Sequence, residues 1–248
     1  MYNFRHSYDR ATDVFYWPLM DVLLWGFASV YIANRPGAIP FIILILLSGL
    51  ILNMVMWRAQ YDITVNLLEE MWSQNMINIF ASPLRLREWI AAVIILGFIK
   101  MVMTLSVATL LAFLIYKANF FSLGFYLIPF MASLLMTGWG IGLLISGVII
   151  YFGTKIQTLA WSGITVITPF SGVFYPISVL PDWAQKIAGF LPTSYIFEGM
   201  RAVILQGQMP IGMLLKSFLI NIIIIIFGLF FFNFMFNKSK QRGLAKLE

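Results

Sequence analysis

Long uncharged stretches alternate with short charged ones along the chain. Asp, Glu, Lys and Arg are absent from residues 36–57, 118–154, 156–181 and 217–237. Each of these runs is long enough for a helix to cross the hydrocarbon core of a bilayer, which takes about 20 apolar residues. Only helices and closed barrels satisfy the backbone inside lipid. Barrel strands alternate apolar and polar residues, whereas residues 218–232 are apolar almost without interruption, so the pattern predicts helices.

The runs and their boundaries predict six membrane-spanning helices in one transmembrane domain over residues 1–248. The first span ends at Asn34-Arg35-Pro36-Gly37, which is a turn sequence. The second ends at Trp57-Arg58, an aromatic and a basic residue of the kind found at a membrane interface. A polar loop over 58–88 and a Pro- and Gly-bearing segment over 178–212 are too polar to span. The expected spans are 14–33, 39–57, 89–116, 124–151, 157–177 and 215–236.

Composition agrees with a membrane protein. The 248 residues are 61% hydrophobic and 10% charged, whereas soluble domains carry about 25% charged residues. The chain has no cysteine, which excludes disulfides and cysteine-based metal sites. The first apolar segment is about 20 residues long, contains Asp21 and is not followed by a small-residue cleavage site, so we expect it to be a span and not a cleaved signal peptide.

The basic residues indicate the orientation, because cytoplasmic loops carry an excess of Lys and Arg. Six spans place both termini on the same side of the membrane. With the termini inside, ten basic residues are inside and five are outside, and Lys100 lies within a span. This bias predicts cytoplasmic termini. The inside set is Arg5, Arg10, Arg58, Arg85, Arg87, Lys155, Lys238, Lys240, Arg242 and Lys246, and the outside set is Arg35, Lys117, Lys186, Arg201 and Lys216.

The loop over 58–88 contains a candidate docking helix. Residues 67–80 include no Gly or Pro, and Pro83 ends the helical stretch. Apolar residues fall near one helical face at positions 68, 71, 72 and 79, and Glu69 and Glu70 are expected in the first turn, where the helix dipole favours acids. The segment suits docking onto a soluble partner, and an interfacial helix lying on the lipid headgroups is the alternative.

Two charged residues, Asp21 and Lys100, lie inside the expected spans. Such residues are costly in lipid and usually face a partner or a water-filled space. At about 1.5 Å per residue their depths differ by roughly 6 Å, which a lysine side chain can bridge. We hypothesise a buried Asp21–Lys100 pair between the first and third spans; separate snorkelling of each side chain to the interface is the alternative.

Small and helix-breaking residues shape the later part of the chain. Gly138 and Gly142, four residues apart in the fourth span, predict close helix packing. Pro and Gly break the end of the fifth span, and residues 182–190 can form a short amphipathic helix with Asp182 at its start. After Pro192, Thr193 or Ser194 can cap a second helix. Glu198 and Arg201, three residues apart, are expected to pair on its surface, where a pair adds little stability.

Sequence signatures of several function classes are missing. No G-x-x-x-x-G-K-[ST] occurs, so the chain does not bind ATP by a P-loop. H-E-x-x-H and G-x-S-x-G are also absent, and the single histidine is in the N-terminal tail. We therefore expect no catalytic, cofactor-binding or metal site. Asp21 is the only acid inside an expected span, which disfavours a paired-aspartate protease.

Three stretches resemble the permeases of ABC-2 type transporters. The first span resembles theirs in FYWPLMDVLLWGFASVY (15–31). Their first cytoplasmic loop, where a coupling helix ends near a Ser-Pro-Leu-Arg element, is similar to LLEEMWSQNMINIFASPLRLREW (67–89). Their most recognisable part, where the fifth span breaks into short extracellular helices, resembles SGVFYPISVLPDWAQKIAGFLPTSYIFEGMRAVI (171–204).

The resemblance implies an all-α membrane protein of ABC-2 (type V exporter-like) permease architecture in a bacterial inner membrane. Two permease chains, expected as a homodimer, would form the pathway. Two separate ABC ATP-binding subunits would dock on the coupling helices and bind ATP and Mg²⁺. The implied docking residues are Glu69, Glu70, Trp72, Asn75, Asn78, Ile79 and Arg85. The implied extracellular re-entrant helices include Pro181, Asp182, Glu198 and Arg201.

Alternative functions remain open at the level of sequence. A hydrophobic or amphiphilic drug or lipid and a lipid-linked glycan both suit an exporter with 17% aromatic residues. A lipid-modifying enzyme would need a cluster of acid, base or metal ligands near the headgroups, and none is visible. A secondary carrier or channel would usually carry more ionisable residues within its spans.

Overall fold

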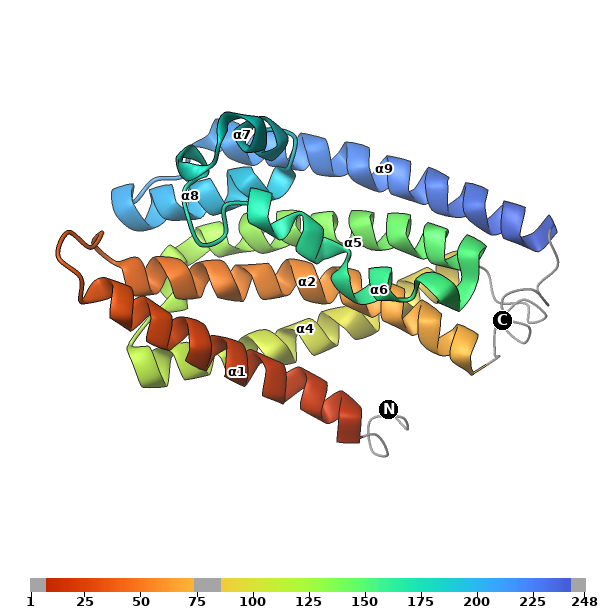
Figure 1. Ribbon diagram of the computed structural model, residues 1–248, viewed down its shortest axis with the longest axis horizontal. Helices are drawn as coiled ribbons and strands as arrows, with labels where there is room; N and C mark the ends of the chain where they lie inside the picture. The colour runs from red at the N-terminus through yellow and green to blue at the C-terminus, as the bar shows by residue number, and fades with distance from the viewer. Residues whose placement is uncertain (1–7, 74–85, 242–248) are drawn as a thin grey trace.

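The computed structural model describes residues 8–73 and 86–241, and every regular element in that part of the chain is helical (Figure 1). Five long helices form a bundle, and short helices join α5 to α9. The long helices are α1 (Tyr8–Ala33), α2 (Ile42–Trp72), α4 (Leu86–Tyr116), α5 (Leu127–Phe152) and α9 (Ile211–Gln241). The short ones are α6 (Thr158–Ser162), α7 (Asp182–Ala188) and α8 (Pro192–Gln206), with 3₁₀ turns at Phe120–Tyr126, Gly153–Ile156, Ile164–Val166, Thr168–Phe170 and Ile177–Val179.

The five long helices are each long and apolar enough to cross a bilayer. Together they make this a multi-pass membrane protein, as the uncharged runs predict. Their outward faces are apolar, and α9 is the clearest case, with exposed Leu219, Ile223 and Phe230. Because lipid is itself apolar, such a face needs no further protein to cover it.

Helix α2 is longer than expected. The sequence predicts an end at Trp57-Arg58, whereas α2 continues without interruption to Trp72. No Gly or Pro lies between positions 50 and 72 to stop it. Arg58 and Asp62 are consequently within the helix, at 1% and 2% exposure. The prediction that Asp21 is the only acid in a spanning helix is therefore wrong.

Helices α5 and α9 run in the same direction. The hydroxyls of Ser133 and Ser217 are 2.6 Å apart, and one turn further on Thr137 donates to Asn221 at 2.7 Å. Both pairs are separated by 84 residues, so positions rise together along the two helices. The chain must therefore return from the end of α5 to the start of α9 (Figure 1).

The return path lies along α2 and is not one helix. Near its start the Ala160 carbonyl accepts from Thr64 of α2, and near its end the Val173 carbonyl lies against Gly49. Between them the chain forms α6 and separate 3₁₀ turns, which differs from the single helix expected over 157–177. Pro169 supplies no amide hydrogen, and Gly172 has a φ of +68°, outside helical values.

Glycines of α5 allow its neighbours to approach closely. A Cβ at Gly138 would be 2.5 Å from the Met56 carbonyl oxygen of α2, and one at Gly142 would be 3.3 Å from Ile63. On another face, a Cβ at Gly140 would be 2.6 Å from Ile224 of α9. The predicted role of Gly138 and Gly142 in close packing is confirmed.

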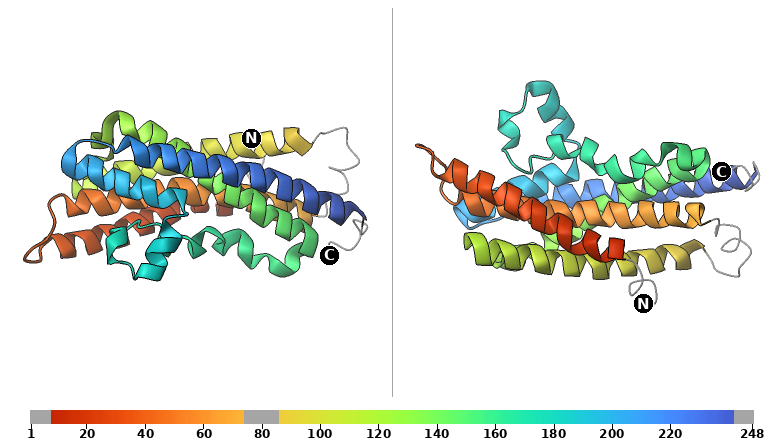
Figure 2. Two further views of the ribbon diagram at one scale, coloured as in Figure 1. Left: turned by 90° about the horizontal axis from the view of Figure 1, so that it is seen from above. Right: turned by 60° about the horizontal axis from the view of Figure 1, so that its bottom comes forward.

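The two ends of the bundle differ. The first and last described residues both lie toward the end where α2 finishes and α4 begins (Figure 2). At the opposite end lie the turn after α1, helix α8, and helix α7, which projects to the side of the bundle (Figures 1 and 2).

Candidate functional site

A cavity lies between α1, α2 and α6. Helix α2 provides one wall through side chains that recur every three or four residues and so share one helical face. Helix α1 adds two side chains four residues apart, and α6 adds one. The volume is about 440 Å³, within the size of small-molecule sites. The lining residues are Trp17, Asp21, Leu50, Asn53, Met54, Trp57, Tyr61 and Trp161.

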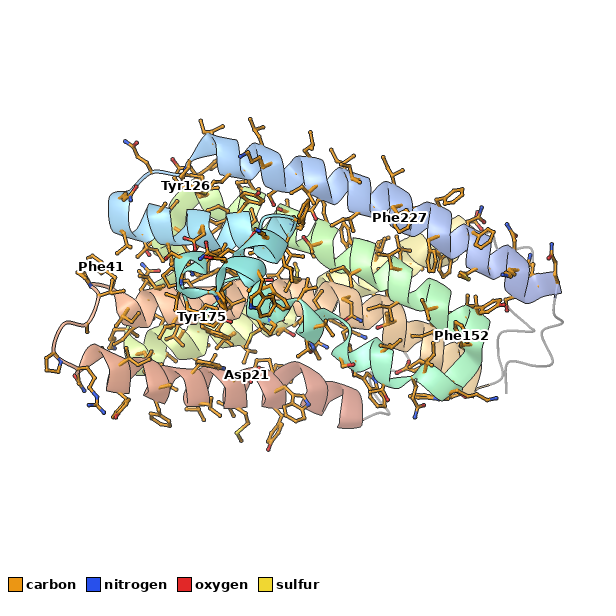
Figure 3. The ribbon with its side chains drawn as sticks, turned by 45° about the horizontal axis from the view of Figure 1, so that its top comes forward. Asp21, Phe41, Tyr126, Phe152, Tyr175 and Phe227 are labelled. Atoms are coloured by element: carbon orange, nitrogen blue, oxygen red, sulfur yellow. The ribbon has the colours of Figure 1, made fainter. Side chains whose placement is uncertain are left out.

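The lining combines aromatic rings with one carboxylate and one side-chain amide. Three tryptophans and one tyrosine come from three different elements, and Asp21 is the single charged side chain among the described residues that line the cavity. Figure 3 places Asp21 on α1, about 9 Å along the helix from Phe15 at 1.5 Å per residue. The Oδ1 atom of Asn53 is buried and has no hydrogen-bond partner in the described part of the chain. Such a surface suits an apolar ligand oriented by one or two polar contacts.

A narrower extension of about 30 Å³ continues from the cavity toward α4. It shares Trp17, Asp21, Met54 and Trp57 with the cavity and adds Pro18, Arg58 and Thr104. Arg58 donates to the Thr104 hydroxyl at 3.2 Å, and its guanidinium carbon is 5.8 Å from the Trp57 ring centre. Arg58 lines the extension and not the main cavity, so its positive charge lies outside the main cavity.

Gln60 fixes the segment that carries Trp161. In an uninterrupted helix the Ile164 amide would donate to the Ala160 carbonyl. Instead, Nε2 of Gln60 donates to that carbonyl at 2.8 Å, and the Ile164 amide donates to Oε1 of Gln60 at 3.4 Å. The side-chain amide thus replaces a missing helix hydrogen bond. It holds the residue next to Trp161 against α2.

Comparison with protein families decides the identity of this architecture. The model of the ABC-2 type transporter family matches residues 3–205, well over half of the chain. The chain belongs to the ABC-2 type transporter family. The match extends from α1 through almost all of α8 and includes every residue that lines the cavity. A comparison with curated proteins found no match.

Family membership makes this permease a membrane subunit of a transporter. Permeases of the family are typically non-catalytic, and the family implies an ABC ATPase partner in general. Among the described residues of the permease, no group of three His, Cys, Asp or Glu side chains could hold a metal ion.

The permease pairs Lys100 with Asp62 and not with Asp21. The Lys100 Nζ is 3.1 Å from the Asp62 Oδ1, and the Asp62 side chain is 3% exposed. The hypothesised Asp21–Lys100 pair does not occur among the described ion pairs. The reason is that α2 continues past Trp57 and brings a closer carboxylate level with Lys100.

The expected docking helix is only partly within the described residues. Glu69 and Glu70 lie in the last turn of α2 and not in a first turn. Leu68 and Met71 are buried in the permease's own core with Ile149 and Phe236, so they offer no face to a partner. Trp72 is 48% exposed. Four predicted contacts, Asn75, Asn78, Ile79 and Arg85, lie outside the described residues.

Two short helices, α7 and α8, form where extracellular re-entrant helices are expected, and their end contacts differ from the expected ones. Pro181 precedes α7, and Asp182 is in its first turn but makes no side-chain cap. Neither Thr193 nor Ser194 caps α8, which begins at Pro192. Their hydroxyls contact Ser171 and the Ala188 carbonyl instead.

The Glu198–Arg201 pair forms, but not on the surface. Arg201 is 6% exposed. It lies 2.9 Å from Glu198 and donates to the Gly172 carbonyl at 2.6 Å. Glu198 also accepts from the Ile177 amide at 2.7 Å. The pair therefore joins α8 to the end of the return segment, which is more than an isolated surface pair would do.

Sequence reasoning missed the cavity. One signal was present, because Asn53, Trp57 and Tyr61 recur every four residues and so share a face of one helix. Because the sequence predicts that this helix ends at residue 57, Tyr61 falls in the predicted loop and not on the same helix as Asn53 and Trp57. Nothing in the sequence places Trp17 or Trp161 opposite this face.

Proposed function

We propose that the chain is the permease subunit of an ATP-driven exporter. Two copies form the substrate pathway, and two separate ABC ATPase subunits supply the energy. The observation that carries this proposal is the family match over residues 3–205. ATP and Mg²⁺ are held by the ATPase subunits, which agrees with the absence of a P-loop in this sequence.

The proposed topology has six crossings with cytoplasmic termini in a bacterial inner membrane. Five crossings are the long helices, and the sixth is the broken segment that returns along α2. An even number of crossings agrees with both described ends lying toward one end of the bundle (Figure 2). The excess of Lys and Arg on that side supports its assignment to the cytoplasm.

The cavity between α1, α2 and α6 is the proposed entry to the substrate pathway. Its aromatic and aliphatic lining supports a hydrophobic or amphiphilic substrate. A lipid-linked glycan is the second substrate class that aromatic rings could accommodate. A glycan carries many hydroxyl groups that need hydrogen bonds when buried, and besides the N–H and O–H groups of its rings the lining offers one carboxylate and one amide.

The test is recovery of the ATPase with the tagged permease in mild detergent, identified by mass spectrometry. We expect a P-loop ATPase to co-purify with the unaltered chain. Trp72→Ala and the double variant Glu69→Arg/Glu70→Arg should lose it, because these positions lie at the end of α2 and within the predicted docking segment. Trp183→Ala is the matched control, since Trp183 is similarly exposed, at 61%, but lies on α7.

Two results would contradict the proposal. Repeated purification without any ATPase, in detergent and in nanodiscs, would favour a secondary carrier or a lipid-modifying enzyme. If the Trp72 and Trp183 variants lost the ATPase equally, the end of α2 would not be a specific part of the docking site.

A further inference from the structure

We propose that the cavity between α1, α2 and α6 binds a lipophilic organic cation. The positively charged centre lies between Asp21 and the rings of Trp17 and Trp161, and its apolar body lies against Leu50 and Met54. As the substrate class of an exporter, this inference rests on the proposed function. The binding event itself does not require an ATPase.

The aromatic lining supplies the first part of the argument. A cation within about 6 Å of an aromatic ring centre is attracted by the electrons of the ring face, and tryptophan attracts most strongly. Three of the eight lining residues are tryptophans, and they come from α1, α2 and α6. Rings on three elements can surround one ligand, whereas rings on a single helix face could contact it from one direction only.

Asp21 supplies the second part. It is the one charged side chain among the described lining residues and lies within the apolar stretch of α1. A carboxylate at that depth is costly and usually serves a ligand or a partner. No hydrogen bond or ion pair to Asp21 occurs in the described part of the chain, and Lys100 is already bound to Asp62. A cationic ligand would neutralise the charge.

Arg58 decides where the positive centre of the ligand lies. Its guanidinium carbon is 5.8 Å from the Trp57 ring centre and 5.9 Å from that of Tyr61. The Arg58 guanidinium thus already lies close to these two rings, on the wall where the cavity meets the narrow extension. A second cation is repelled from that wall. Asp21 and Trp17 line both the extension and the main cavity, whereas Trp161 lines the main cavity alone, so the favourable position lies beside Asp21 and Trp17 on the side of Trp161.

The wall offers too few strong acceptor groups for a strongly hydrated cation. Apart from Asp21, the one side chain with an amide or carboxyl group is Asn53, whose buried Oδ1 has no partner among the described residues and can accept up to two hydrogen bonds. A cation with delocalised or shielded charge loses little hydration on entry. The cavity of about 440 Å³ admits a molecule of several rings.

The experiment compares two ions of the same shape and opposite charge, tetraphenylphosphonium and tetraphenylborate. Radiolabelled ion binds at equilibrium to the full chain in phosphatidylcholine nanodiscs, and uptake by empty nanodiscs is subtracted. We expect saturable binding of the cation at least about tenfold tighter than binding of the anion. Equal affinity for the two ions, or a preference for the anion, would overturn the proposal without any variant.

Variants then locate the site. Asp21→Asn keeps the size of the side chain and removes the charge, and we expect it to weaken cation binding about five- to tenfold. Trp161→Leu should weaken it by a similar factor, while Trp183→Leu, on α7, should leave it unchanged. Each variant is used only if its thermal unfolding midpoint matches that of the unaltered chain. Unchanged affinity in Asp21→Asn would contradict the assignment of this cavity.

The outcome separates this inference from the proposed function. Cation binding without a co-purifying ATPase would keep the site and reject the ABC exporter. If an ATPase co-purifies but the permease binds the cation and the anion equally well, the exporter is kept and the cation is rejected as its substrate class.

Discussion

At the scale of single residues, three polar side chains of α2 connect it to its neighbours at nearly the same level of the bundle. Arg58 donates to Thr104 of α4, Gln60 bridges two backbone groups of the return segment, and Asp62 binds Lys100 of α4. A buried polar group without a partner costs about 1–3 kcal/mol. These contacts therefore favour one arrangement of α2, α4 and the return segment over alternatives that bury the same apolar surface.

The Asp62–Lys100 pair gives a prediction at this scale. Asp62→Lys and Lys100→Asp should each lower stability by about 3 kcal/mol, because each places two like charges in a buried site. The double exchange Asp62→Lys/Lys100→Asp should recover part of the loss. The measurement is the thermal unfolding midpoint of purified protein in detergent. Asp21→Lys/Lys100→Asp is the control and should show no recovery of stability. Recovery in this control would mean that Lys100 pairs with Asp21 and not with Asp62.

At the scale of elements, α5 packs between α2 and α9. Glycines on two of its faces let α2 and α9 approach closely, and a side-chain hydroxyl and amide then connect α5 to α9, as Asn221 donates to the Ser133 hydroxyl. Apolar attraction between helices is weak in lipid, so association depends on close packing and interhelical hydrogen bonds. The order of small and polar residues along α5 therefore determines which helices become its neighbours.

Glycine substitutions test this packing. Gly138→Ala should lower stability by about 1–3 kcal/mol, because the new Cβ would lie 2.5 Å from the Met56 carbonyl oxygen and the two helices would have to separate. Gly212→Ala on α9 is the matched control, since nothing lies within 4 Å of a Cβ there. It should leave stability unchanged or raise it slightly, because alanine favours helix. Equal unfolding midpoints for the two variants would contradict the role given to Gly138.

At the scale of the whole molecule, five long helices and one broken segment lie along one another in the described part of the chain. The broken segment exposes backbone groups that a helix would satisfy, and side chains of α2 and α8 bind them. Gln60 binds at Ala160 and Ile164, and Arg201 binds the Gly172 carbonyl. Irregular backbone is tolerated inside a membrane only where protein or water satisfies it in this way.

The proposed topology predicts how single cysteines react. The natural chain contains none, so Ser73→Cys at the end of α2 and Ser178→Cys near α7 introduce unique thiols. A maleimide that cannot cross the membrane should label Ser178→Cys in intact cells and Ser73→Cys only after lysis. The reverse pattern would invert the orientation, and labelling of both thiols in intact cells would exclude an odd number of crossings between positions 73 and 178.

The sequence by itself determined that this is a helical membrane protein, where most of its long helices lie and which family it resembles. Those properties depend on residues that are close together in the chain: about 20 apolar residues cross a bilayer wherever they occur. The sequence also marked Asp21 and Lys100 as unusual, because a charge in an apolar run is visible locally.

Only the tertiary structure decided which residues meet. The partner of Lys100 is Asp62, because α2 continues past Trp57 and no local signal ends it. In the broken segment that returns along α2, the backbone groups that the break exposes are satisfied by Gln60, from another helix. The cavity needs side chains from α1, α2 and α6 on one surface. Such contacts depend on the rotation and depth of each helix, which packing against its neighbours sets.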